Sequence, residues 1–301
     1  MSESPISDRD TLTRFLLERS GVRGVLVHLD DAWQAVRART SYPESVAERL
    51  GETCAAAALF TGHVKVDGRL SVQMRGTGAL RTLFAECTSE GTVRGIAHYA
   101  EPLPVPLTPR AFGAGSVLAI TIENQPAGGQ EMQRYQGLVD LDADYLSEAF
   151  EGYFSHSEQL PTRVLLAANG DRASALMLQR LPEGPASDRE SWVRCGALFD
   201  TLSPGELLTV SVESLLWRLF HEEGVRVLGQ RPLSFACSCS QARVEDMLRS
   251  LGVEEALAAA EAGQAEIHCD FCGQGYAFSP EQILTLFQAP RPSAPGSERL
   301  Q

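Results

Sequence analysis

The chain has 301 residues, of which 44% are hydrophobic, and its formal net charge is −13. A surface this negative argues against a nucleic-acid backbone or an anionic membrane as the main partner, because both would repel it. No apolar run is long enough to cross a bilayer as a helix, and the polar, acidic first residues do not resemble a secretory signal, so we expect a cytoplasmic protein.

Residues 1–183 alternate strand-like and helix-like stretches, and we expect them to form a core domain. The sequence VRGVLVHL, at 22–29, predicts a strand, and a helix over 30–40 follows it. Over 42–62 a second helix is predicted, in which Pro43 suits a first helical position. This helix is apolar on more than one face, so we expect it to be buried between layers.

The stretch HVKVDGRLSVQMRG, at 63–76, predicts a β-hairpin in which Asp67 and Gly68 form a two-residue turn. Hairpins outnumber crossover connections in this part of the chain. The fold class is therefore α+β, with antiparallel sheet and a buried helix. Further predicted elements are strands at 92–99, 116–122 and 134–140, a helix over 142–156, and a strand pair at 162–169 and 174–181.

A change in composition at 182–191 marks a boundary, and we expect a helical linker over 184–232. Helices are predicted at 191–202, 203–210 and 211–224, and a short strand at 225–229. An apolar stripe at helical spacing in the third helix predicts docking on a core. The stripe consists of Leu215, Leu216, Leu219 and Phe220, with Trp217 beside it.

Four of the seven cysteines lie in a third segment, 233–289, which precedes a proline-rich tail at 290–301 that we expect to be disordered. They form a Cys-x-Cys pair and a Cys-x-x-Cys pair. Two close pairs turn four thiolates toward one point, which is the tetrahedral set that zinc prefers. The predicted ligands of one Zn²⁺ per chain are Cys237, Cys239, Cys269 and Cys272.

The residues around these pairs predict a small folded unit. Gly273 follows the second pair, where a positive φ lets the loop curl under the metal. A helix that ends at Gly252 and a second helix over 253–263 connect the pairs, and 275–278 predicts a strand. The last helix begins after Ser279 as N-cap, with Gln282 in the capping-box position. The first helix has the apolar positions Val244, Met247, Leu248 and Leu251.

The remaining cysteines and the neighbouring histidine are expected to have no chemical role. Four thiolates satisfy zinc, so His268 is interpreted as an exposed or supporting residue. Cys54, Cys87 and Cys195 lie in apolar or helical contexts and are interpreted as small buried hydrophobic residues.

Several stretches together point to a known family. They are QRYQGLVDL (133–141), YFSHSEQLPTR (153–163), LLWRLFHEEGV (215–225), CSCS (237–240) and HCDFCG (268–273). In this order and spacing they resemble the heat-shock protein thirty-three family of redox-regulated holdase chaperones. The resemblance covers most of the chain, from about residue 22 to the helix after the second cysteine pair.

The resemblance implies a chaperone that works without ATP and is not an enzyme. Its reduced form is zinc-bound and inactive. Oxidation would form the disulfides Cys237–Cys239 and Cys269–Cys272, release zinc and unfold the zinc-binding domain and the linker. The opened protein would dimerise and bind unfolding proteins to prevent their aggregation under oxidative stress. If the linker helices pack partly against the zinc unit, its loss would also expose the apolar stripe.

Two other functions remain open on the residues alone. One is a static interaction module that zinc merely staples together. Its nucleic-acid-binding version is disfavoured, because 233–289 carries two basic and eight acidic residues, a net charge of 2 − 8 = −6. The other is a thiol–disulfide oxidoreductase that uses Cys269 and Cys272. This is disfavoured because a glycine and a strand follow the pair, where a redox pair usually opens a helix.

Overall fold

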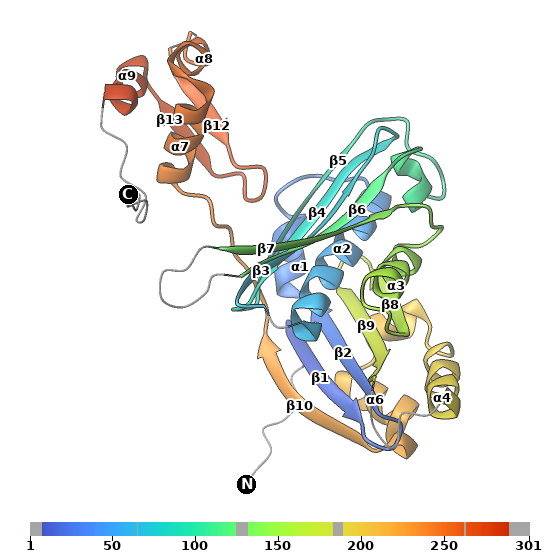
Figure 1. Ribbon diagram of the computed structural model, residues 1–301. Helices are drawn as coiled ribbons and strands as arrows, with labels where there is room; N and C mark the ends of the chain where they lie inside the picture. The colour runs from blue at the N-terminus through green and yellow to red at the C-terminus, as the bar shows by residue number, and fades with distance from the viewer. Residues whose placement is uncertain (1–7, 65, 125–131, 183–188, 262, 289–301) are drawn as a thin grey trace, which may run out of the picture. The chain divides into compact units, whose positions relative to one another are not determined.

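The computed structural model describes residues 8–64, 66–124, 132–182, 189–261 and 263–288 (Figure 1). The chain divides into two compact units, Met1–Ala236 and Cys237–Gln301. The fold is α+β with antiparallel sheets, as the sequence predicts. Among the described residues, no helix has both the length and the apolar character needed to cross a membrane.

One sheet of the first unit has five strands, all antiparallel, in the order β10-β1-β2-β9-β8. The β2–β9 pairing joins residues about 150 positions apart and the β1–β10 pairing joins residues more than 200 positions apart, so the sheet closes the first unit. Its strands are β1 (Thr11–Leu17), β2 (Val22–Leu29), β8 (Thr162–Ala168), β9 (Ala173–Arg180) and β10 (Val225–Pro232).

The second sheet has six strands in the order β11-β5-β4-β3-β6-β7. All of its pairings are antiparallel except that of β11 with β5, which is parallel. The strands are β3 (Gly68–Arg75), β4 (Leu80–Thr88), β5 (Thr92–Tyr99), β6 (Val117–Asn124), β7 (Gln133–Asp140) and β11 (Ser234–Phe235).

Helix α2 (Glu44–His63) lies between the two sheets and forms the centre of the main core (Figure 1). Small residues let it approach them closely. A Cβ added to Gly95 of β5 would lie 2.6 Å from Cys54 Sγ, so the strand passes directly over the helix there. The predicted burial of this helix is confirmed, since Leu50, Cys54 and Phe60 are all buried. The flanking helices are α1 (Asp31–Arg37), α3 (Leu146–Ser157) and the one-turn η1 (Pro109–Phe112).

Three helices cover the other face of the five-stranded sheet and make a second core. The stripe on α6 is docked as predicted, and the Phe220 ring stacks on that of Phe15 of β1 with centroids 6.3 Å apart. Its partners lie in the first unit, on β1, β2 and β9. Trp217 is 65% exposed. The elements are α4 (Arg189–Phe199), α5 (Pro204–Thr209), α6 (Val212–Phe220) and η2 (His221–Glu223).

The second unit pairs a two-stranded antiparallel sheet with three helices. Its six buried hydrophobic residues form a core of their own. Gly252 has φ +96° between the first two helices, which is the stop that the sequence predicts. The elements are α7 (Gln241–Leu251), α8 (Val253–Ala258), β12 (Ala265–His268), β13 (Gly275–Phe278) and α9 (Pro280–Gln288).

The hairpin predicted at 63–76 is wrong. Helix α2 continues to His63, whose buried ring lies 3.0 Å from a carboxylate oxygen of Glu158, and the next strand begins only at Gly68. Instead of forming a turn, the Asp67 backbone N–H donates to the side chain of Asn124. Lys65, the 183–188 boundary and the 290–301 tail lie outside the described residues.

Candidate metal centre

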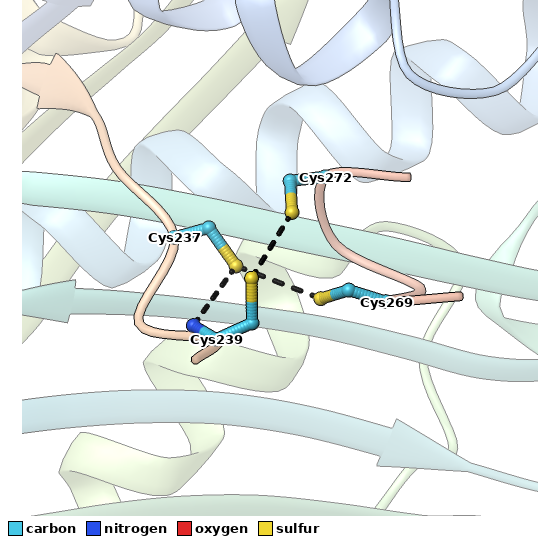
Figure 2. Close-up of side chains that lie close together, drawn as sticks. All are labelled: Cys237, Cys239, Cys269 and Cys272. Atoms are coloured by element: carbon cyan, nitrogen blue, oxygen red, sulfur yellow. Dashed lines mark hydrogen bonds between the residues drawn. The ribbon is translucent and has the colours of Figure 1, made fainter. Parts of the chain in front are cut away.

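The four cysteines that the sequence selects lie together in the second unit (Figure 2). Cys237 and Cys239 precede α7, and Cys269 and Cys272 lie in the loop between β12 and β13. All four Sγ atoms are within 4.8 Å of one another. The two pairs touch each other, with 3.6 Å between the sulfurs of Cys237 and Cys269 and 3.4 Å between those of Cys239 and Cys272.

The loop that carries the second pair has the conformation its sequence predicts. Gly273 has φ +71°, in the left-handed region that a side chain would disfavour. This lets its N–H donate to the carbonyl of Cys269 at 2.7 Å, while the Cys269 N–H donates to the carbonyl of Gln274 at 3.0 Å. Two backbone hydrogen bonds therefore close the knuckle and hold both thiols on one side of it.

The helix after the first pair begins with a side-chain cap. Ser240 Oγ accepts a hydrogen bond from the Arg243 N–H at 3.3 Å and so defines the first turn of α7. Cys239 Sγ faces the same cluster from the residue before this cap, and its own N–H lies 3.5 Å from Cys237 Sγ. The cap fixes where the helix starts and hence where the pair stands relative to it.

Tyr276 is a functional neighbour that the sequence did not reveal. Its hydroxyl donates to Cys239 Sγ at 3.2 Å, which lowers the pKa of that thiol to about 7. The same hydrogen bond raises the pKa of Tyr276 to about 12, and burial raises that of Cys272 to about 12. Tyr276 pairs with Ile267 across the β12–β13 ladder, so only the register brings its ring to the sulfurs.

The donor set fits a zinc ion. Four sulfurs placed about 2.3 Å from a central ion in a tetrahedron would be about 3.8 Å from one another. The contacts of 3.6 and 3.4 Å and the 4.8 Å limit bracket that spacing. An all-thiolate tetrahedral set is typical of zinc or of iron–sulfur centres rather than of calcium or magnesium. The cluster therefore has the shape and the chemistry of a metal site.

The other cysteines and His268 lie as the sequence predicts. His268 is exposed, whereas Cys54, Cys87 and Cys195 are buried in the first unit. Burial raises the pKa of all three thiols, that of Cys87 to about 11, so they are held in the unreactive thiol form.

Comparison with known proteins identifies the family. A family model described as "Hsp33 protein" matches residues 10–279. The chain belongs to the Hsp33 family. A 33 kDa chaperonin of Pseudomonas fluorescens (strain Pf0-1) is 43% identical over 299 residues, which cover 97% of this chain and 98% of the relative. The 33 kDa chaperonin of Pseudomonas aeruginosa (strain LESB58) is 42% identical over 301 residues, 98% and 100% of the two chains.

A solved structure supports the fold. The crystal structure of the 33 kDa chaperonin from Thermotoga maritima, also an Hsp33 homologue, superposes with a TM-score of 0.77. It covers 93% of this chain and 98% of its own, at 20% sequence identity. Membership of the Hsp33 family supports a chaperone role for this chain. Its relatives are named chaperonins, which points to a protein that is not an enzyme.

Proposed function

We propose that this protein is a redox-regulated chaperone of the cytoplasm that holds unfolding proteins without ATP. The observation that carries the proposal is the meeting of four thiols in a unit with little core of its own. In the reduced protein, Cys237, Cys239, Cys269 and Cys272 would hold one zinc ion as thiolates. Such a site supplies folding energy to the unit that contains it.

The second unit needs that energy. Among its described residues, six hydrophobic ones are buried and three of these are alanines, whereas a unit of this size is marginal even with larger side chains. Metal binding in small domains of this kind contributes on the order of 10–16 kcal/mol to folding. The reduced, metal-bound unit is folded and the protein is inactive as a chaperone.

Oxidation would remove the donors. With hydrogen peroxide, each cysteine pair gives up two electrons and forms an S–S bond, while the O–O bond of one peroxide breaks and two waters result. A disulfide sulfur is no longer a thiolate ligand, so the oxidised cysteines release the ion. Short-loop disulfides restrict the unfolded chain little and do not replace it as a source of stability.

The expected disulfides are Cys237–Cys239 and Cys269–Cys272, as the family resemblance implies. The sulfur contacts of the reduced site run across the pairs, from Cys237 to Cys269 and from Cys239 to Cys272. Because all four sulfurs lie within 4.8 Å of one another, pairing within each motif and pairing across the motifs are both within reach of the reduced site. Peptide mapping of the oxidised protein distinguishes the two patterns.

The unfolded unit would then free surface for clients. Because the linker at 184–232 is part of the same chain and precedes the second unit, unfolding of that unit would extend into the linker. Unfolding of this linker must break contacts within the first unit, because α6 is packed on the five-stranded sheet. The opened protein would form a homodimer, and the net charge of −13 would keep it in solution with apolar cargo bound.

The test compares reduced and peroxide-treated protein in a light-scattering assay with a thermally aggregating client. We expect suppression of aggregation from the oxidised sample alone, together with loss of four free thiols and of bound zinc. A matched variant carries alanine at the three buried cysteines, Cys54, Cys87 and Cys195, and should respond in the same way. Equal activity of reduced and oxidised samples would favour the static zinc-stapled module instead.

An oxidoreductase has less support from the geometry. Cys272 is followed by Gly273 and then by β13 rather than by a helix whose N-terminus could stabilise a thiolate. Turnover in an insulin-reduction assay that a Cys272→Ser change abolishes would support that function.

A further inference from the structure

Strand β10 is an unusual edge strand, because its side chains bury almost nothing. It pairs with the whole of β1, from Thr11 opposite Pro232 to Leu17 opposite Val225 (Figure 1). Over 225–232, all of which the structure describes, no residue is buried. Five of the seven β1 residues are fully buried hydrophobic or threonine side chains. A strand held by its backbone ladder with few apolar contacts belongs to the least stable parts of a fold.

The side chains of β10 also make polar contacts with neighbouring elements. Gln230 donates to Thr13 Oγ1 at 2.8 Å, Arg226 pairs with Glu18 at 2.7 Å, and Arg231 donates to the Ser89 carbonyl at 2.9 Å. These contacts fix the position of β10 along β1. Arg231 also donates to Oγ1 of the buried Thr61 in α2. These contacts are hydrogen bonds and one ion pair, and water can replace them when the strand leaves.

The two strands differ as sheet edges. β10 has two arginines, a terminal proline and a β-bulge at Leu228, where Arg14 lies opposite Gly229 and Phe15 opposite Val227. Charge, proline and bulges are the features by which proteins keep exposed edges from pairing with other chains. β1, with the sequence TLTRFLL, has neither glycine nor proline and only one charge. With β10 in place the sheet has a protected edge, and without it an unprotected one.

The chain after β10 leads directly to the cysteines. Leu233 is buried, β11 pairs with the start of β5, and the Ala236 N–H donates to the Val93 carbonyl at 3.3 Å. The next residue is Cys237. We call residues 225–236 the strap. Because the strap ends where the second unit begins, unfolding that starts at the cysteines reaches it first.

We propose that the outer edge of β1 is a client-binding site, which the strap covers in the reduced protein and leaves on oxidation. The occupant is an extended segment of an unfolding protein, paired antiparallel with β1 by backbone hydrogen bonds. The strap itself shows what this edge accepts: a strand whose side chains remain exposed. Such an edge recognises backbone rather than sequence, which suits clients of unrelated sequence. This inference rests on the proposed redox-regulated function.

The opposite sheet offers an edge that serves as an internal comparison. β7 is also a terminal strand, and its Tyr135 and Leu138 are 60% and 63% exposed. It is already accessible with the strap in place, so it cannot account for a surface that opens only on oxidation. Binding at β7 would be seen at different amides from binding at β1.

Hydrogen exchange with mass spectrometry on the full-length protein tests the proposal. In oxidised protein alone, we expect the amides of 225–236, and those of 11–17 that donate to β10 rather than to β2, to lose protection. After addition of a thermally unfolded client, those of 11–17 should regain protection and those of 225–236 should not. If the oxidised protein suppresses aggregation while 11–17 stays protected throughout, or is never protected again by client, the inference is wrong although the function stands. Absence of suppression would contradict the function itself.

A strap that cannot leave gives a second test. Thr13 and Gln230 lie directly opposite each other with their side chains in contact, so a Thr13→Cys/Gln230→Cys pair has the geometry for a disulfide. Once peptide mapping shows this bridge in the oxidised protein, we expect loss of client binding despite oxidation of the four switch cysteines. Gln230→Cys alone cannot form the bridge and should remain active. Equal activity of the bridged variant would overturn the proposal.

Discussion

In the first unit a 20-residue helix is buried between two sheets, whereas the part of the second unit that the structure describes has only six buried hydrophobic residues, three of them alanines. The first unit has large buried side chains such as Trp33, Phe60 and Phe150 at its centre. The second has four sulfurs within 4.8 Å of one another. Apolar burial stabilises the first unit, whereas under the proposed function a bound ion stabilises the second.

This difference makes one end of the chain sensitive to chemistry that leaves the other intact. Apolar burial does not depend on the redox state of the solution, whereas thiolate ligands are lost when they are oxidised. In the first unit the thiols of Cys54, Cys87 and Cys195 are buried and have raised pKa values. Under the proposed function, an oxidant therefore acts on the thiols of the second unit and leaves those of the first unit unchanged.

Removal of the metal should have the largest effect. Treatment of the reduced protein with a strong zinc chelator should unfold 237–288, since binding contributes on the order of 10–16 kcal/mol. The first unit should keep its structure up to the linker at 184–232. Limited proteolysis followed by mass spectrometry should show rapid cleavage after Cys237, then cleavage within 184–236, and a resistant fragment that ends before the linker. Cleavage at equal rates in both units would contradict the comparison.

The next largest effect is expected from a change in the second core of the first unit, where α4 to α6 pack on the five-stranded sheet. Phe220→Ala removes a fully buried ring stacked on Phe15 and should lower the free energy of unfolding by about 3–5 kcal/mol. Helices α4 to α6 should loosen, and the reduced protein should bind a hydrophobic dye. Trp217→Ala, on the same helix but 65% exposed, should change stability by less than about 0.5 kcal/mol. Similar effects of the two changes would show that α6 is not docked as described.

Local features of the sequence were sufficient for much of the second unit. The cysteine spacing, the stop at Gly252 and the capping box at Ser279 each depend on a few neighbouring residues, and all are present. Contacts between residues far apart in the sequence could not be predicted from such local features. The place of Tyr276 beside Cys239 depends on the register of two strands, which single residues do not reveal.

The first unit shows more clearly which features of the fold the sequence alone does not reveal. The sequence predicted a hairpin around Asp67-Gly68, where packing of α2 between two sheets instead extends the helix to His63. It did not predict β1 or β4, because their apolar residues do not alternate strictly with polar ones: β1 has Phe15, Leu16 and Leu17 in a row, and β4 has Leu83, Phe84 and Ala85. Nor could it show that the stripe on α6 packs on the five-stranded sheet.

Loss of the tyrosine hydroxyl should weaken the metal site. Tyr276→Phe removes the hydrogen bond to Cys239 Sγ while the ring remains. Changes to such supporting partners typically cost about 10–100-fold in metal affinity. Competition with a chromophoric chelator measures this effect directly. Tyr135→Phe, in the exposed part of β7, is the control and should leave the affinity unchanged.

A buried carboxylate makes the linker sensitive to acid. Glu223 accepts hydrogen bonds from Arg194 at 2.6 and 3.0 Å and from Ser20, and the Arg194 bonds hold its pKa below the ordinary value of 4.5. Its contribution to stability is present above pH 4.5 and is lost as the pH falls through the lowered pKa.

Arg194→Met should therefore destabilise the protein at pH 7 by about 1 kcal/mol. The effect is modest because Ser20 still donates to the carboxylate and about half of the Arg194 side chain lies in solvent. Denaturant unfolding at several pH values should show the difference from the unchanged protein shrinking as Glu223 becomes protonated. A difference that grows in acid would mean that the pair does not stabilise the fold.

The smallest effect concerns the last helix. Ser279 and Gln282 form a capping box, with hydrogen bonds of 3.2 and 2.8 Å. Ser279→Ala should cost about 0.5–1 kcal/mol of stability in the second unit and nothing in the first. Amide exchange in 280–288, compared with that in α2, measures it. Faster exchange in α2 as well would show that the two units unfold together.

The most direct test of the central claim is a peroxide titration in which bound zinc, oxidised cysteines and client binding are measured on the same samples. The account predicts one zinc per chain in the reduced protein, and its release in step with oxidation of Cys237, Cys239, Cys269 and Cys272 and with suppression of aggregation. A reduced protein that contains no metal while 237–288 resists protease would contradict it.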